Sequence, residues 1–312
     1  MIMPPLFGLL ALTLAAAHGP AKPQESLARL KVRMDQVAAG FQGVLGYSLR
    51  GPGGEQINLR GDERFPTAST IKVAVMCEAL SEVEEGKLKW SQPIMVQPGL
   101  GGREAGGPAY YFRDGSELPL SEWIDLMITM SDNTATIRLR DLLGQENINN
   151  WLKAHGFQQT LILNGADTDR LGLRALQRQY GLGVTTPNEM VRLFDMIANG
   201  GAASAASCER MIRILGHQYW DDGIASQIPP GVQVASKSGA IDGTRSDVAI
   251  VHAPGGDYTL AIYTRDQKDD RWAKDNAGCA AIRTLSAIVW KHFNPASTWT
   301  PPTGADELWP TS

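Results

Sequence analysis

The chain has 312 residues, enough for one or two domains with a substantial hydrophobic core. Hydrophobic residues make up 43% and charged residues 20% of it, which is ordinary for a soluble globular protein. The formal net charge of −4 argues against nucleic acid as a partner, because proteins that bind nucleic acid usually present a basic face.

The amino-terminal residues carry the pattern of an export signal. Residues 6–17 form an apolar run that ends in alanines and is too short to span a bilayer, which takes about 20 residues. Its length suits a signal peptide, although the positive region before it is weak, so a core helix or an uncleaved anchor is the alternative. We expect residues 1–19 to be a signal peptide, and the mature chain to be a periplasmic or secreted monomer with no membrane span.

The first half of the mature chain begins with a helix and two strands. Apolar spacing predicts a helix over 24–39 and strands over 43–50 and 55–60, joined by the Gly-Pro-Gly-Gly turn at 51–54. A second helix is predicted over 69–85.

The middle of the chain is mainly helical and its end is mainly β. Helical patterns cover residues 121–130, 135–143, 147–155, 187–199 and 208–215. Three strands follow over 232–238, 247–252 and 258–264, and a long helix covers 275–293. The five strands can form one antiparallel sheet only if the two ends of the chain meet.

We therefore predict an α/β (α+β) fold, with a five-stranded antiparallel sheet flanked by helices plus an all-helical lobe. One domain would cover 24–294, with a sheet lobe from 24–66 and 217–294 and a helical lobe from 67–216. The Pro/Thr-rich residues 295–312 are predicted to be a loose tail.

The cysteines and histidines give no sign of a metal or redox site. Cys77, Cys208 and Cys279 show no C-x-x-C spacing, and their odd number leaves at least one thiol unpaired. We expect each cysteine to pack as a small hydrophobic residue. The alternative is that two of the three form one disulfide. The five histidines are scattered, so we predict no metal and no cofactor.

Three short motifs stand out in chain order: Ser69-Thr70-Ile71-Lys72, Ser131-Asp132-Asn133 and Lys237-Ser238-Gly239. Each is weak alone, since an S-x-x-K match is expected about once in a chain of this length from average composition. The alternatives are a helix cap at Ser69, an ordinary cap and turn at the second motif, and a surface lysine at the third. The order and the contexts together favour a catalytic set.

The chemistry of the set is coherent. Ser69 opens a helix, where backbone N–H groups favour negative charge, and Lys72 lies one turn later on the same face. Lys72 can act as a base only if burial and a nearby cation lower its pKa, and Lys237 is the obvious cation.

The remaining polar groups have matching roles. Ser131 would relay a proton to the leaving nitrogen, and Asn133 would hold Lys72 and the amide of the substrate. The backbone N–H groups of Ser69 and Ala240 would form an oxyanion hole.

Longer segments resemble the class A β-lactamases of the penicillin-recognising superfamily, whose signature includes these three motifs. They are residues 65–69 (FPTAS), 128–135 (ITMSDNTA), 185–187 (TTP) and 237–250 (KSGAIDGTRSDVAI), and the similarity covers about residues 35–293. The resemblance implies a β-lactamase/transpeptidase-like fold and a β-lactam or a D-Ala peptide as the small-molecule substrate.

By this resemblance, Ser69 is the nucleophile, Lys72 its partner, and Ser131 and Lys237 flank the leaving group. The substrate-binding residues would be Asn133, Ser238, Gly239, Ala240 and Arg245. Ser238 and Arg245 would bind the carboxylate that both substrate classes carry. The alternative for Arg245 is a structural ion pair with Asp242 or Asp247.

One departure concerns the omega loop. The family carries E-x-x-L-N there, and its glutamate activates the deacylating water. In this chain the glutamate would fall near Gly172 and the asparagine near Leu176. The only acids between residues 157 and 188 are Asp167 and Asp169.

We expect Asp169 and its neighbour Arg170 to make structural contacts in the loop, whereas Gln177 or Gln179 could position a water. Acylation is therefore expected without the family's usual route to deacylation. Four functions follow: a β-lactam hydrolase, a D-Ala-D-Ala carboxypeptidase or related penicillin-binding enzyme, an esterase or amidase, and a sensor that is acylated without turnover.

Overall fold

A computed structural model describes residues 25–97, 99 and 106–304. The predicted signal peptide at 1–19 lies outside these residues. Among the helices that are described, none is both long enough and apolar enough to cross a bilayer.

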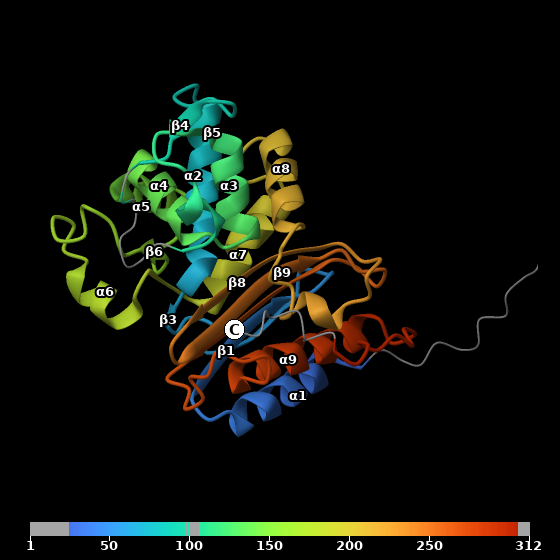
Figure 1. Cartoon of the computed structure of the whole chain (residues 1–312). Helices are drawn as coiled ribbons and strands as arrows, with labels where there is room; N and C mark the ends of the chain where they lie inside the picture. The colour runs from blue at the N-terminus through green and yellow to red at the C-terminus, as the bar shows by residue number, and fades with distance from the viewer. Residues whose placement is uncertain (1–24, 98, 100–105, 305–312) are drawn as a thin grey trace, which may run out of the picture.

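The centre of the fold is the predicted five-stranded antiparallel sheet, in the order β2-β1-β10-β9-β8. Its strands are β1 (Val44–Arg50), β2 (Gln56–Leu59), β8 (Val234–Ile241), β9 (Thr244–Val251) and β10 (Tyr258–Arg265). Because β1 pairs with β10, a strand from the first part of the chain lies beside one from the last part, as the single sheet requires (Figure 1). The predicted fold class is confirmed.

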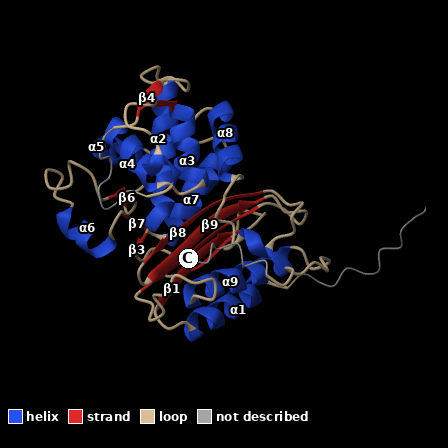
Figure 2. Cartoon of the chain, in the orientation of Figure 1, coloured by secondary structure: helices blue, strands red, loops and turns tan. Residues whose placement is uncertain are grey.

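Helices cover both faces of this sheet (Figure 2). On one face lie α1 (Leu27–Gly40) and α9 (Ala277–Phe293), which bury apolar side chains such as Leu30 and Leu285 against the strands. The other face carries the helical lobe, of which α7 (Pro187–Ala198) contacts β1, β9 and β10. The sheet therefore forms the middle of three layers.

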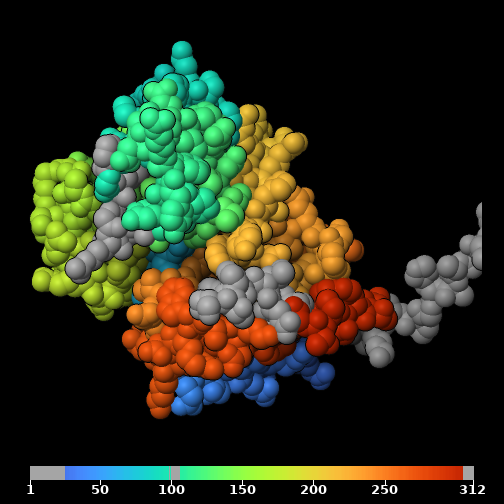
Figure 3. All heavy atoms as spheres, in the orientation of Figure 1, coloured from blue at the N-terminus to red at the C-terminus, as the bar shows by residue number. Residues whose placement is uncertain are grey.

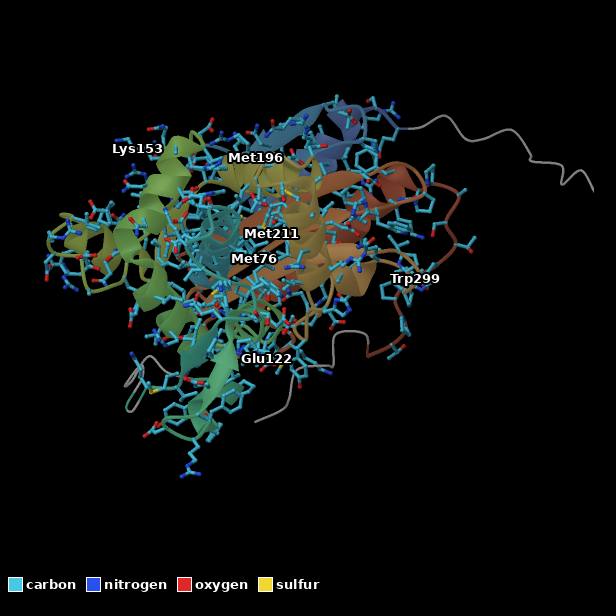
Figure 4. The ribbon with its side chains drawn as sticks, turned by 90° about the horizontal axis from the view of Figure 1, so that it is seen from above. Met76, Glu122, Lys153, Met196, Met211 and Trp299 are labelled. Carbon is cyan, nitrogen blue, oxygen red and sulfur yellow. The ribbon has the colours of Figure 1, made fainter. Side chains whose placement is uncertain are left out.

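The helical lobe is built around α2 (Lys72–Glu84), whose first nine residues are all buried. Around it lie α3 (Leu120–Thr129), α4 (Asn133–Leu143), α5 (Gln145–Ala154) and α8 (Ala205–Leu215). Met76 of α2 and Met211 of α8 mark the interior of this lobe (Figure 4). The helix expected from residue 69 begins as a 3₁₀ turn and becomes α-helical at Lys72.

Several short elements were not predicted from the sequence. A small sheet is formed by β3 (Phe65–Pro66), β7 (Gly183–Thr185) and β6 (Leu161–Ile162), and a hairpin by β4 (Pro93–Met95) and β5 (Glu117–Pro119). The omega segment contains α6 (Arg174–Tyr180), which has no fully buried residue. Strands of two or three residues are too short to show periodicity, and α6 has no buried face to give it an apolar stripe.

All three cysteines are free and buried. The predicted loose tail begins at residue 295, but here the chain still contacts α9. Lys291 donates hydrogen bonds to the carbonyl oxygens of Ser297 and Trp299 at 3.0 and 2.8 Å.

Candidate active site

Ser69 lies in the 3₁₀ turn η1 (Ala68–Ile71), which leads into α2 and packs against β8 and β9. Ala68 has a φ of +46°, a left-handed conformation that costs energy in a residue with a side chain and is often found at functional sites. A Cβ atom at Gly239 would lie 2.7 Å from the Thr67 carbonyl oxygen and 2.9 Å from the Ser69 nitrogen. Only glycine lets the β8 backbone approach Ser69 this closely.

Lys72 is fully buried beside Ser131 and Asn133. Its Nζ atom donates to the Ser131 carbonyl oxygen at 2.7 Å, the Ser131 hydroxyl at 3.2 Å and the Asn133 Oδ1 atom at 2.9 Å. Burial, and then the charge of Lys237, hold the pKa of Lys72 well below its usual value. These are the two conditions under which a lysine can act as a base.

The Ser131 hydroxyl is shared by two lysines. Ser131 has a φ of +55°, and both its carbonyl and its hydroxyl accept hydrogen bonds from Lys72. Lys237 is also fully buried, and its Nζ donates to the same hydroxyl at 3.2 Å and to the Ser238 carbonyl oxygen at 2.9 Å. Burial lowers the pKa of Lys237 to about 7, against the opposing effect of Asp247.

Asp132 plays a different part from its two neighbours in the motif. Its carboxylate caps α4 by accepting from the Ala135 nitrogen, and it also accepts from the Ala109 nitrogen, both at 2.7 Å. The alternative of a cap and turn is therefore true of Asp132. Ser131 and Asn133 on either side are left to contact Lys72.

Asp247, which the sequence suggests only as an ion-pair partner for Arg245, is a buried acid. It pairs with Ser238 across the β8–β9 ladder and is 4% exposed. One oxygen accepts from the Ile224 nitrogen at 2.7 Å, while Oδ1 has no hydrogen-bond partner among the described residues. Burial raises the pKa of this carboxyl to about 7.

Arg245 is 3% exposed and stacks over the ring of Trp272, with 4.9 Å from Cζ to the ring centroid. Its guanidinium donates hydrogen bonds to three backbone carbonyl oxygens, those of Ile241, Thr244 and Arg271. The backbone, and not an ion pair with Asp242 or Asp247, holds it in place. Arg245 ties the β8–β9 turn to the loop before α9.

Two cavities meet at Ser69. The first, with a volume of about 320 Å³, is lined by Ser131, Ser238 and Arg245, and by Trp220 as an apolar wall. All three motifs therefore contribute polar groups to this cavity, although the two buried lysines do not line it.

The second cavity, of about 580 Å³, lies between α4, α6 and the end of β8. Asn133 and Arg140 line it from α4. Gln177 and Arg178 line it from α6, and Ser69 lies at the end it shares with the first cavity. No carboxylate of the described residues lines it.

The acids of the omega segment make structural ion pairs, as expected for Asp169. That carboxylate binds both nitrogens of one edge of Arg174, each at 2.7 Å. Arg170 binds Asp167 at 3.1 Å and Glu146 at 2.7 Å. Neither acid is therefore available beside Ser69.

Gly172, where the family glutamate was expected to fall, is exposed and has a φ of +68°. A Cβ atom there would meet nothing within 4 Å, and the residue lines neither cavity. Gln177 does line the second cavity, and its Oε1 accepts from Arg174 at 2.6 Å. Within the described ranges, no three His, Cys, Asp or Glu side chains come together to hold a metal ion.

Known proteins are similar to this chain in sequence and in fold. The model of the beta-lactamase enzyme family matches residues 29–293. A beta-lactamase from Streptomyces fradiae is 25% identical over 289 residues, covering 88% of this chain and 91% of the relative. The chain belongs to the beta-lactamase enzyme family.

Solved structures agree with this assignment. A beta-lactamase from Sphaerobacter thermophilus has a TM-score of 0.75 at 25% identity, covering 87% of this chain and 99% of its own. A mutant of a protein named PBP-A, solved as an acyl-enzyme complex with penicillin G, has a TM-score of 0.75 at 27% identity and covers 88% and 99%.

Proposed function

We propose that this protein is an exported serine hydrolase that is acylated at Ser69 and opens the amide bond of a β-lactam ring. The observation that carries the proposal is the hydrogen-bonded chain Lys72–Ser131–Lys237 beside Ser69. Family membership and the named β-lactamases among the relatives support the same reaction. The periplasm or the medium is its proposed location.

The reaction needs three proton transfers. Neutral Lys72 takes the proton of the Ser69 hydroxyl as its oxygen attacks the carbonyl carbon, and the N–H groups of Ser69 and Ala240 stabilise the oxyanion. The C–N bond then breaks, and Ser131 donates a proton to the leaving nitrogen. Lys72 restores the Ser131 proton through its 3.2 Å hydrogen bond, which leaves the acyl group on Ser69.

The two cavities divide the substrate between them. Ser131, the proton donor, lines the first cavity, so the leaving nitrogen and its carboxylate belong there. Ser238 and Arg245 line the same cavity and supply a hydroxyl and a positive charge for that carboxylate. The acyl side chain then extends past Asn133 into the second cavity.

A penicillin-binding enzyme that acts on D-Ala peptides, or a sensor that stays acylated, is the second candidate. The observation that favours it is the second cavity, where no described carboxylate could activate a water for deacylation. The likeness to PBP-A, whose mutant was captured as an acyl-enzyme, points the same way. With a penicillin as the substrate, the lifetime of the acyl-enzyme separates the two candidates.

Time-resolved mass spectrometry of the intact protein with excess benzylpenicillin tests the proposal. A hydrolase shows a transient adduct of one penicillin and steady accumulation of penicilloate. An adduct that persists for hours without penicilloate establishes the penicillin-binding alternative. Ser69→Ala must abolish the adduct while keeping the melting temperature, and an adduct on that variant would refute Ser69 as the nucleophile.

A further inference from the structure

Among the described residues, the second cavity is lined by positively charged side chains and by no negatively charged one. Arg140 and Arg178 are the charged side chains among its described lining residues, and they come from opposite walls, α4 and α6. A cavity that opens beside the nucleophile and carries two guanidinium groups favours an anion. The arrangement on each wall shows how these groups are presented.

On the α4 wall, four residues form one stripe along the helix: Asn133, Thr136, Ile137 and Arg140. Their spacing of i, i+3, i+4 and i+7 places them on a single face. Asn133 lies at the Ser69 end, and Arg140 lies about 10 Å further along the axis, at about 1.5 Å per residue. Ser69 and Arg140 therefore line the same cavity, with Arg140 further along α4 than Asn133.

Asp141 fixes the Arg140 side chain but leaves part of its guanidinium available to a ligand. Its Nε and Nη2 atoms bind the Asp141 Oδ1 atom at 3.0 and 2.8 Å. Its side chain is 10% exposed, and its Nη1 atom makes no hydrogen bond to the described residues. A fixed guanidinium with one unused edge is suited to bind a carboxylate.

Arg178 approaches from the α6 wall, which stands at one side of the molecule beside the helical lobe (Figure 3). It is exposed and makes no ion pair with any described residue. Asp169 interacts with the charge of Arg178 but accepts both of its side-chain hydrogen bonds from Arg174. Arg178 can therefore move to meet a group that enters the cavity.

We propose that the second cavity selects substrates whose acyl side chain ends in a carboxylate, which Arg140 and Arg178 bind. The distance along α4 indicates a carboxylate several atoms beyond the amide, at the end of a short aliphatic chain. This inference rests on the proposed acylation of Ser69, because that reaction directs the acyl group into this cavity. Arg140 and Arg178 are then residues that determine specificity and have no part in bond breaking.

Two penicillins that differ in one group provide the test. Adipyl penicillin and hexanoyl penicillin share a six-carbon acyl chain, which ends in a carboxylate in the first and in a methyl group in the second. The second-order rate constant for acylation by each is measured by mass spectrometry on the full chain. We expect the adipyl-to-hexanoyl ratio to fall about tenfold in Arg178→Gln and further in the double variant with Arg140→Gln.

Arg138→Gln is the matched control, because Arg138 lies on the same helix but outside the cavity and donates to the Met95 carbonyl oxygen. It removes the same charge and should leave the ratio unchanged. Arg178→Gln keeps the test valid if the buried Arg140 variant fails to fold. An unchanged ratio in Arg178→Gln and in folded Arg140→Gln overturns the inference, whereas failure of both penicillins to acylate the wild type overturns the proposed function.

Discussion

Lys72 donates two hydrogen bonds to Ser131, one to its carbonyl oxygen at 2.7 Å and one to its hydroxyl at 3.2 Å. Ser131 has a φ of +55°, a conformation that is uncommon for a residue other than glycine, and this backbone accompanies the double contact. The fold thus places the hydroxyl between Lys72 and Lys237, where it can pass a proton.

Ser131→Ala should slow acylation by benzylpenicillin about a hundredfold, since it removes the hydroxyl that protonates the leaving nitrogen. The carbonyl bond to Lys72 remains, so the melting temperature should change by no more than a few degrees. The rate is measured by mass spectrometry of the adduct. Ser116→Ala, at an exposed hydroxyl that binds the Arg113 carbonyl, is the control. A rate equal to that of the wild type would remove Ser131 from the mechanism.

The second-order rate of acylation should fall as the pH rises above about 7. Burial and the charge of Lys237 lower the pKa of Lys72 well below its usual value, which favours the neutral base, whereas Lys237, whose pKa is about 7, loses its charge as the pH rises. The carboxylate of the substrate then loses the cation that lies behind Ser131 and Ser238 in the wall of the first cavity. Lys237→Arg should move this alkaline limb to higher pH, because a guanidinium keeps its proton. An alkaline limb unchanged by Lys237→Arg would assign the titration to another group.

Asp247→Asn should change how stability depends on pH. Burial raises the pKa of Asp247 from 3.8 to about 7, so its contribution is complete below pH 3.8 and is lost as the pH rises through about 7. Between pH 5 and 7 the wild type should lose about 1–2 kcal/mol of unfolding free energy that the variant does not lose. Lys237 does not add to this loss, because its pKa is lowered and any change it causes has the opposite sign. Urea unfolding at both pH values measures the difference, and parallel declines would contradict it.

The sheet and the central residues of the candidate site could be predicted because local patterns in the sequence encode both. The alternation of apolar residues and the turn residues marked all five long strands, and the interleaved order required the ends of the chain to meet. The S-x-x-K, S-D-N and K-S-G motifs identified the residues that the fold brings together around Ser69. Short-range spacing alone placed Lys72 one turn from Ser69.

The rest of the site depends on contacts between distant segments. Asp247 is significant because it is buried and because its Oδ1 atom has no hydrogen-bond partner among the described residues, and neither property leaves a pattern in sequence. Arg245 donates hydrogen bonds to three carbonyl oxygens, and one of them, that of Arg271, is 26 residues away in the sequence. The omega segment shows the limit most clearly, since counting residues from the motif led to Gly172, whereas α6 turns Gln177 toward the cavity.

This difference leads to a test of deacylation. Gln177→Glu puts a carboxylate in the second cavity beside Ser69, where it can act as a general base on water. It should shorten the lifetime of the benzylpenicillin adduct at least tenfold, while the acylation rate changes little. The Arg174 guanidinium, which already donates to Oε1 at 2.6 Å, keeps the new side chain charged.

Gly172→Glu is the matched control, because it adds the same charge to the same loop at an exposed position that lines neither cavity. The adduct should persist as in the wild type, and the φ of +68° should cost about 1 kcal/mol of stability. Adduct lifetimes are followed by mass spectrometry after removal of free penicillin. Faster deacylation in Gly172→Glu but not in Gln177→Glu would show that the loop rearranges in the acyl-enzyme and that counting from the motif had found the functional position.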